Sequence, residues 1–142
     1  MRRVLHMAML WAVITSGVSA VPAQAHAVRS STWSHNNSIV ELVSMGNERI
    51  FRYLEMYASS VPASPGDVVF RGRRVGRTYN GVAYLFSSRC GRIGYQVSGR
   101  VTNSETRVVM TGRAPRRNAQ CEVIGYRIES LVFDYIRNPE VL

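Results

Sequence analysis

The chain contains no lysine, so each of its 18 basic residues is an arginine. It also has only three histidines and two cysteines among its 142 residues. A metal site needs three or four suitably spaced ligands, so the sequence predicts neither a bound metal nor another cofactor. GC-rich coding favours arginine over lysine without any selection for binding, so the composition alone does not establish an anion site.

Long apolar runs are absent except at the start of the chain. Residues 1–3 are cationic, residues 4–21 are mostly apolar, and small alanines alternate with larger residues over positions 23–27. This order is typical of a bacterial secretory signal peptide. We expect residues 1–25 to be removed, with cleavage after Ala27 as a close alternative. A permanent anchor needs about 20 consecutive apolar residues, which polar residues interrupt here, and no spanning segment is predicted after Ala27.

The signal peptide predicts a periplasmic or secreted location, which changes the interpretation of the two cysteines. In an oxidising compartment, Cys90 and Cys121 are expected to form a disulfide. It would close a loop of about 30 residues and stabilise the fold by roughly 3–4 kcal/mol. A redox couple and a pair of metal ligands are the alternatives, but the sequence has neither a Cys-x-x-Cys motif nor enough other ligands.

Short β-branched and aromatic segments dominate the chain after the leader. Residues 26–37 are polar and predict an irregular lead-in, with Trp33 inserted into the core. A β-barrel-like domain is expected over residues 38–137, followed by a C-terminal tail over residues 138–142. The expected strands are residues 38–44, 49–57, 67–75, 79–88, 94–102, 107–114, 121–128 and 130–136. The segment 49–57 has a helix as its alternative, because it contains good helix formers.

Turn signals recur about every 8–12 residues, which is the spacing of an antiparallel sandwich or a small barrel. The sequence therefore predicts an all-β fold of seven to eight strands in a meander, with one disulfide. Several glycines lie inside the predicted strands, where they permit the sharp coiling that closure needs. They favour a closed barrel and are Gly72, Gly81, Gly99, Gly112 and Gly125.

Removal of Arg2 and Arg3 with the leader leaves 16 arginines against 9 acidic residues. Such a positive field favours anionic partners, here an envelope lipid, glycolipid or polymer, or a periplasmic protein. Nucleic acid is not expected, because export separates it from the protein and no aromatic-basic recognition motif is present. The predicted contact surface consists of Arg71, Arg73, Arg74, Arg113, Arg116 and Arg117.

Aromatic residues of the predicted strands suggest a second type of site. Tyr84, Phe86, Tyr95 and Tyr126 would line a ligand cavity if the barrel were hollow. Aromatic residues of this kind more often fill a packed core. A carrier of a small apolar ligand is therefore the alternative function, and a packed interior would count against it.

Catalysis has little support in the sequence. His35 is the sole credible imidazole base after cleavage, but no nucleophile elbow or oxyanion glycine run accompanies it. We expect it to cap a strand. Among the carboxylates, Asp134 is the least ordinary, lying between Phe133 and Tyr135, and we expect it to face outward and to pair with an arginine. A hydrolase is the least supported hypothesis.

Five blocks carry a resemblance to other proteins: residues 33–36, 81–91, 95–99, 112–116 and 121–126. With them the chain resembles an uncharacterised family of short exported proteins of Gram-negative bacteria that carry two cysteines. The resemblance implies a periplasmic or secreted location and the two-cysteine framework. It implies no activity, ligand or catalytic residue. The leading hypothesis is therefore a non-enzymatic β-module that binds an anionic envelope component or a partner protein.

Overall fold

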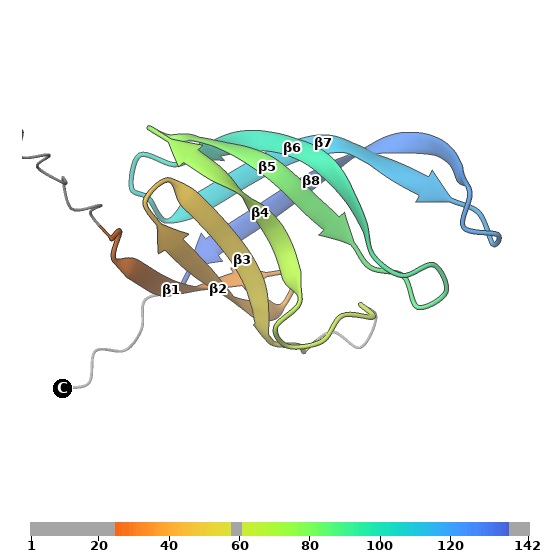
Figure 1. Ribbon diagram of the computed structural model, residues 1–142, viewed down its shortest axis with the longest axis horizontal. Coiled ribbons are helices and arrows are strands. Elements are labelled where there is room, and N and C mark those ends of the chain that lie inside the picture. Colours follow the sequence, from red (N-terminus) through yellow and green to blue (C-terminus); the bar gives the residue numbers. More distant parts are fainter. Residues whose placement is uncertain (1–24, 58–60, 137–142) are drawn as a thin grey trace, which may run out of the picture.

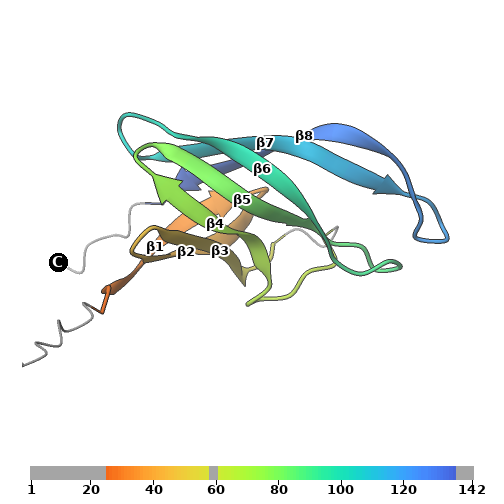
Figure 2. The same cartoon turned by 45° about the horizontal axis from the view of Figure 1, so that its top comes forward.

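The computed structural model describes residues 25–57 and 61–136 of the chain. Within them, eight antiparallel strands follow one another as a meander and close into a barrel (Figure 1, Figure 2). The predicted all-β fold is confirmed, and its barrel form is the one present. The strands are β1 (Val28–His35), β2 (Ser38–Met45), β3 (Glu48–Glu55), β4 (Val68–Val75), β5 (Thr78–Leu85), β6 (Ile93–Val101), β7 (Arg107–Arg117) and β8 (Val123–Tyr135).

The irregular lead-in predicted for residues 26–37 is wrong, because most of this segment is β1. The strand pairs with β2 over its full length. Asn36 and Asn37 connect the two strands with φ angles of 47° and 59°. Positive φ at both central residues is what a two-residue hairpin turn requires, and asparagine tolerates it. The polar composition of β1 concealed a strand that has only Trp33 as a large inward apolar residue.

A second difference concerns the C-terminal strands, which were predicted as residues 121–128 and 130–136. They form one continuous strand, β8, because Glu129 and Ser130 continue the pairing with β7. Cys121 lies in the preceding turn with a φ of 66°. The strand interpretation of residues 49–57 is confirmed by β3. The predicted signal peptide, apart from Ala25, and the tail over residues 138–142 lie outside the described residues.

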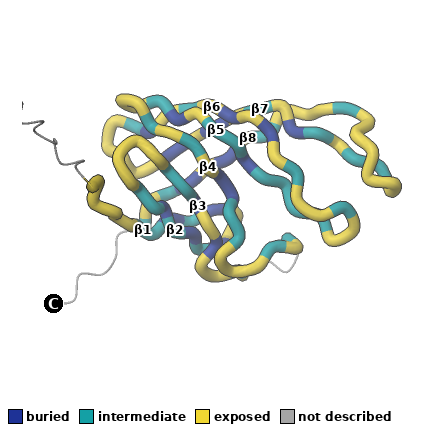
Figure 3. The backbone as a smooth tube through the Cα atoms, in the orientation of Figure 1, coloured by how far each residue is buried: buried dark blue, intermediate teal, exposed yellow. Residues whose placement is uncertain are grey.

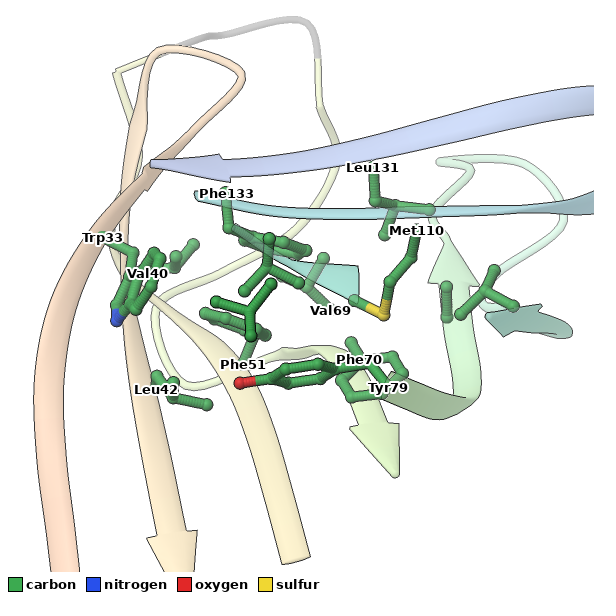
Figure 4. Close-up of a cluster of buried hydrophobic side chains, with 14 of the residues drawn as sticks. Trp33, Val40, Leu42, Phe51, Val69, Phe70, Tyr79, Met110, Leu131 and Phe133 are labelled. Atoms are coloured by element: carbon green, nitrogen blue, oxygen red, sulfur yellow. The ribbon is translucent and has the colours of Figure 1, made fainter. Parts of the chain in front are cut away.

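Aromatic side chains fill the barrel (Figure 4). Phe51 and Phe133 stack with their ring centroids 3.9 Å apart, and the Trp33 ring meets Phe51 edge-on at 5.7 Å. The prediction that Trp33 inserts into the core is confirmed, since its exposed fraction is 5%. Each such buried side chain stabilises the fold by about 1.5–3 kcal/mol. Figure 3 shows that the buried residues concentrate in the body of the barrel.

Glycines allow the wall to coil tightly around this core. Gly72 and Gly81 face each other across β4 and β5. A Cβ atom on Gly72 would lie 2.2 Å from the Asn80 carbonyl oxygen, and one on Gly99 would lie 1.8 Å from the Val109 carbonyl oxygen. No side chain fits in these positions, which agrees with the role predicted for Gly72, Gly81, Gly99 and Gly112. The prediction does not hold for Gly125, where an added Cβ would meet no atom within 4 Å.

One end of the barrel wall splits open. Pairing between β6 and β7 stops at Val97 and Gly112, whereas β7 and β8 remain paired as far as Arg117 and Val123. The backbone N–H and carbonyl groups of odd-numbered β7 residues point to β6. The Arg107 carbonyl, for example, accepts a hydrogen bond from the Thr102 N–H. Pro115 therefore occupies a β6-facing position without an N–H to donate. The β7–β8 hairpin consequently projects beyond the barrel (Figure 2).

The tight wall predicts the effect of a single methyl group. Gly99→Ala forces a Cβ against the backbone of β7, and we expect the free energy of unfolding to fall by about 3 kcal/mol, the upper end for overpacking. Gly125→Ala is the matched control, because no atom lies within 4 Å of a Cβ added there. We expect a change within about 0.5 kcal/mol for it. Urea denaturation measures both, and equal effects would contradict the close-approach explanation.

Candidate functional site

A cationic groove lies between the β5–β6 loop and the tip of the β7–β8 hairpin. Its volume is about 580 Å³. We call it the arginine groove, because four of its lining residues are Arg89, Arg116, Arg117 and Arg127. Leu85, Phe86 and Pro115 supply apolar wall. The groove exists because β6 and β7 separate at this end of the barrel.

Two cross-links hold the groove in shape. Cys90 and Cys121 form the predicted disulfide, which joins the β5–β6 and β7–β8 loops with their Cα atoms 5.3 Å apart. Arg117 donates hydrogen bonds from its two Nη atoms to the carbonyl oxygens of Cys90 and Gly91, at 2.7 and 2.8 Å. Asn118 fixes the tip by accepting the N–H groups of Gln120 and Glu122. The guanidinium of Arg117 is therefore structural, and the other three arginines line the groove with it.

Charge in the groove is only partly neutralised. Arg127 pairs with Glu129. Within residues 25–57 and 61–136, neither Arg89 nor Arg116 forms an ion pair, and both are exposed. Two unpaired guanidinium groups in one groove present the parallel N–H donors through which arginine can bind phosphate or carboxylate.

The six arginines predicted as one contact surface do not form one patch. Arg71 and Arg73 are exposed on β4, which β5 and β6 separate from β7. Arg113 lies over the Tyr126 ring, 5.2 Å from its centroid. Only Arg116 and Arg117 line the groove.

Arg74 lies at the opposite rim and pairs with Glu105. This contact lowers the pKa of the Glu105 carboxyl, with smaller contributions from Arg49 and Arg77. A cavity of about 310 Å³ lies beside the pair, and Arg29 and Arg49 also line it. Its positive charge is offset by a carboxylate, so it is a weaker anion site than the groove.

Sequence reasoning missed Arg89 and Arg127 as members of the site. Arg89 was detectable, because the predicted disulfide brings its neighbour Cys90 next to the loop that carries Arg116 and Arg117. Arg127 was not, because its alignment with the groove depends on the projection of β8 beyond the barrel.

The predicted aromatic cavity is present only as a shallow mouth. Its volume is about 190 Å³, and Tyr84, Phe86 and Tyr95 border it, whereas Tyr126 is exposed on the outside of β8. Burial raises the pKa of the Tyr95 hydroxyl to about 12, with a smaller contribution from Glu129. Below this mouth the barrel is filled by the aromatic core.

His35 belongs to the wall of the barrel. Its Nδ1 lies 2.9 Å from the Val132 carbonyl oxygen on β8, and the Asn36 amide nitrogen lies 3.2 Å from its Nε2. The neutral tautomer that donates from Nδ1 and accepts at Nε2 satisfies both contacts. The ring stacks on Phe133 with centroids 4.5 Å apart. Burial lowers the pKa of His35, so the neutral form closes the β1–β8 seam.

Neither a carboxylate site nor a metal site has support among the described residues. Asp134 pairs with Arg107, as predicted for an outward strand residue. Across the described residues, no group of three His, Cys, Asp or Glu side chains is placed to hold a metal ion. The same residues include no helix with the length and apolar character needed to cross a bilayer.

Comparisons with protein-family models, with curated proteins and with solved structures find no match to this chain.

The buried histidine predicts a pH dependence of stability. The pKa of His35 in the folded protein lies below its usual 6.5, so below that pH the unfolded chain takes up a proton that the folded protein does not. The free energy of unfolding therefore decreases as the pH is lowered below about 6.5, with a slope of up to about 1.4 kcal/mol per pH unit. Urea denaturation between pH 7.5 and 5 should show a shallower slope for His35→Gln, and equal slopes would contradict this assignment.

The disulfide predicts a loss of stability that is largest at one end of the molecule. The double variant Cys90→Ser, Cys121→Ser should lose about 3–4 kcal/mol in the free energy of unfolding. Amide hydrogen exchange should accelerate more in the β5–β6 loop and the β7–β8 tip, which also open locally, than in β2 and β3, whose protection falls only with the global stability. Uniform acceleration across all strands would show that the disulfide supports the whole barrel.

Proposed function

We propose that the protein is a non-enzymatic binding module of the bacterial periplasm or exterior, which holds an anionic component of the cell envelope in its arginine groove. The observation that carries the proposal is the pair Arg89 and Arg116. Both are exposed and unpaired within the described residues, and the disulfide and Arg117 fix the walls around them. Because the cross-links already hold the backbone that carries them, binding has to order only the two side chains, which favours affinity.

The placement of the arginines argues that base composition alone does not account for the charge of the groove. Elsewhere, Arg52 pairs with Glu41 and Arg107 with Asp134, whereas other arginines, such as Arg71 and Arg73, are exposed on a single strand. Those of the groove converge on one concave surface from the β5–β6 loop and from the ends of β7 and β8. Phosphate or carboxylate groups of an envelope glycolipid, phospholipid or acidic polymer are ligands that such a surface would bind.

The alternative of a small-ligand carrier has less support. Ligand pockets usually measure about 300–1,000 Å³ and enclose most of the ligand. The barrel mouth measures about 190 Å³, and the aromatic core lies below it. We do not propose a hydrolase, because both ring nitrogens of His35 are engaged in the wall.

The proposed location depends on the leader and on the disulfide. The leader lies outside the described residues and has the composition of an export signal. A disulfide between the two loops is compatible with an oxidising compartment.

Charge reversal in the groove tests the proposal. Co-sedimentation of the disulfide-bonded protein with phospholipid vesicles, envelope glycolipid and cell-wall sacculi should show binding to one fraction that weakens steeply with salt, because counterions are released. Arg89→Glu with Arg116→Glu should weaken this binding by about tenfold or more.

The matched control is Arg71→Glu with Arg73→Glu, which changes the net charge equally on the far side of β5 and β6. It should retain most of the binding. Equal losses in the two double variants would show that total charge, not the groove, is responsible. Binding insensitive to salt would reject an electrostatic site altogether.

A further inference from the structure

Most of β8 has no partner strand on one of its edges. The barrel closes between β1 and β8 through only two residue pairs, Trp33 with Tyr135 and Ser34 with Asp134. The Tyr135 N–H points to β7, where it donates to Thr106, and the Ile136 N–H points to β1, where it donates to Thr32. Backbone groups alternate along a strand, so those of Tyr126, Ile128 and Ser130 also point away from β7.

These backbone groups are open. The backbone of Val132 points the same way, and its carbonyl accepts a hydrogen bond from the His35 ring. From Ser130 back toward Tyr126, no hydrogen bond within residues 25–57 and 61–136 reaches the N–H or carbonyl groups of Tyr126, Ile128 or Ser130. We call the segment Tyr126–Ser130 the free edge of β8. It is long enough to accept the ladder of a short added strand.

The outer side of the free edge is apolar. Tyr126 and Ile128 are 58% and 72% exposed, and Ile124 beside them is 61% exposed. Natural proteins usually protect a free edge with charges, prolines or bulges. Here the register shift opposite Arg116 and Arg117 leaves Ile124 unpaired near the tip. Between Tyr126 and Ser130 there is neither a proline nor a bulge, and the two charged residues, Arg127 and Glu129, pair with each other on the inner side.

The inner side of the same edge carries an ion pair beside the groove. Arg127 alternates with Tyr126 and Ile128 and pairs with Glu129. It lines the arginine groove together with Arg89 and Arg116, neither of which has a carboxylate partner within the described residues. A strand added to the edge would place one set of its side chains against the apolar row and the other set beside the groove. The formal net charge, +9 for the whole chain and +7 without Arg2 and Arg3, opposes a second copy of this chain as the occupant and favours an acidic one.

We propose that the free edge of β8 binds an extended, acidic segment of a partner protein as a ninth strand. The segment pairs antiparallel with Tyr126–Ser130, as every strand of the barrel does with its neighbours. It sets apolar side chains against Tyr126 and Ile128, and it sets acidic side chains on the inner side, toward the arginine groove. Main-chain hydrogen bonds supply the affinity, and the alternation of side chains supplies the selectivity. This interaction uses the backbone of β8 and so goes beyond an anion held by side chains alone.

Model peptides test the proposal on the unmodified protein. A fluorescent eight-residue peptide that alternates valine and glutamate should bind at least about tenfold tighter than one that alternates valine and lysine. The lysine peptide has the same β-propensity pattern and the opposite charge. Binding of both peptides with equal affinity would overturn the acidic selectivity.

Backbone methylation separates strand addition from charge attraction. In an added antiparallel strand, residues paired with the free edge have side chains on the outer face, so the valine N–H groups point to β8. A glutamate peptide methylated at its valine nitrogens should lose binding by about tenfold or more, while one methylated at its glutamate nitrogens retains it. All three glutamate peptides carry the same charge, so equal binding would overturn the proposal.

Variants of β8 provide the complementary test. Ile128→Pro removes one N–H of the free edge, at an edge position that tolerates proline, and should weaken the glutamate peptide by about tenfold. Ile128→Thr keeps the N–H and should weaken binding of the glutamate peptide by only about threefold. Val109→Thr on the outside of β7 is the control and should bind as the wild type does. Unchanged binding by Ile128→Pro would overturn the proposal.

Hydrogen exchange gives a readout that does not depend on a variant. Peptide binding should slow the exchange of the Tyr126, Ile128 and Ser130 amides, whereas those of Arg127 and Glu129 face β7 and change little. A dimer that forms without peptide and disappears in Ile128→Pro would identify a second copy as the occupant and overturn the acidic partner. Ile128→Pro keeps every arginine, so its salt-sensitive co-sedimentation should persist, and the two proposals can fail separately.

Discussion

The short seam between β1 and β8 is the constraint on which the rest of the molecule depends. Two residue pairs and the hydrogen bond from His35 to the Val132 carbonyl close the barrel. These contacts bring Trp33 edge-on to Phe51, which stacks on Phe133, and the rings then fill the interior. Because β8 is much longer than the seam, its N-terminal half must leave the barrel. The groove and the free edge both result from this difference in length.

The projecting hairpin is held by contacts of a different kind from those of the barrel. In the barrel, a continuous ladder and an apolar core stabilise each strand. The ladder with β6 ends at Gly112, and Pro115 has no N–H with which to resume it. The disulfide and the bonds of Arg117 to Cys90 and Gly91 take its place. Covalent and charge-assisted contacts hold two loops at a fixed separation without closing the space between them. A groove with rigid walls is the result.

Much of the fold could be predicted, because local sequence patterns determine it. Alternating apolar residues, turn residues and strand glycines indicated the barrel, and the export signal indicated how to interpret Cys90 and Cys121. The polar strand β1 was missed, since its stability comes from pairing with β2 and from Trp33 rather than from its own pattern. The site was only half predictable. Arg116 and Arg117 were found as a sequence cluster, whereas Arg127 joins them through the projection of β8, which no local pattern encodes.

Position, rather than number, decides what the arginines of this chain can do. Arg74 and Arg107 are matched by carboxylates, and Arg117 is occupied by carbonyl groups. These side chains stabilise the wall and offer little to a ligand. Arg89 and Arg116 have no such partner within the described residues, and they face a groove whose far side carries Arg127. The unmatched charge of Arg116 and the unmatched backbone of β8 therefore lie on the same hairpin, and Arg89 joins them in the groove from the β5–β6 loop. An extended acidic segment would satisfy both, since its carboxylates meet the groove while its main chain completes the sheet.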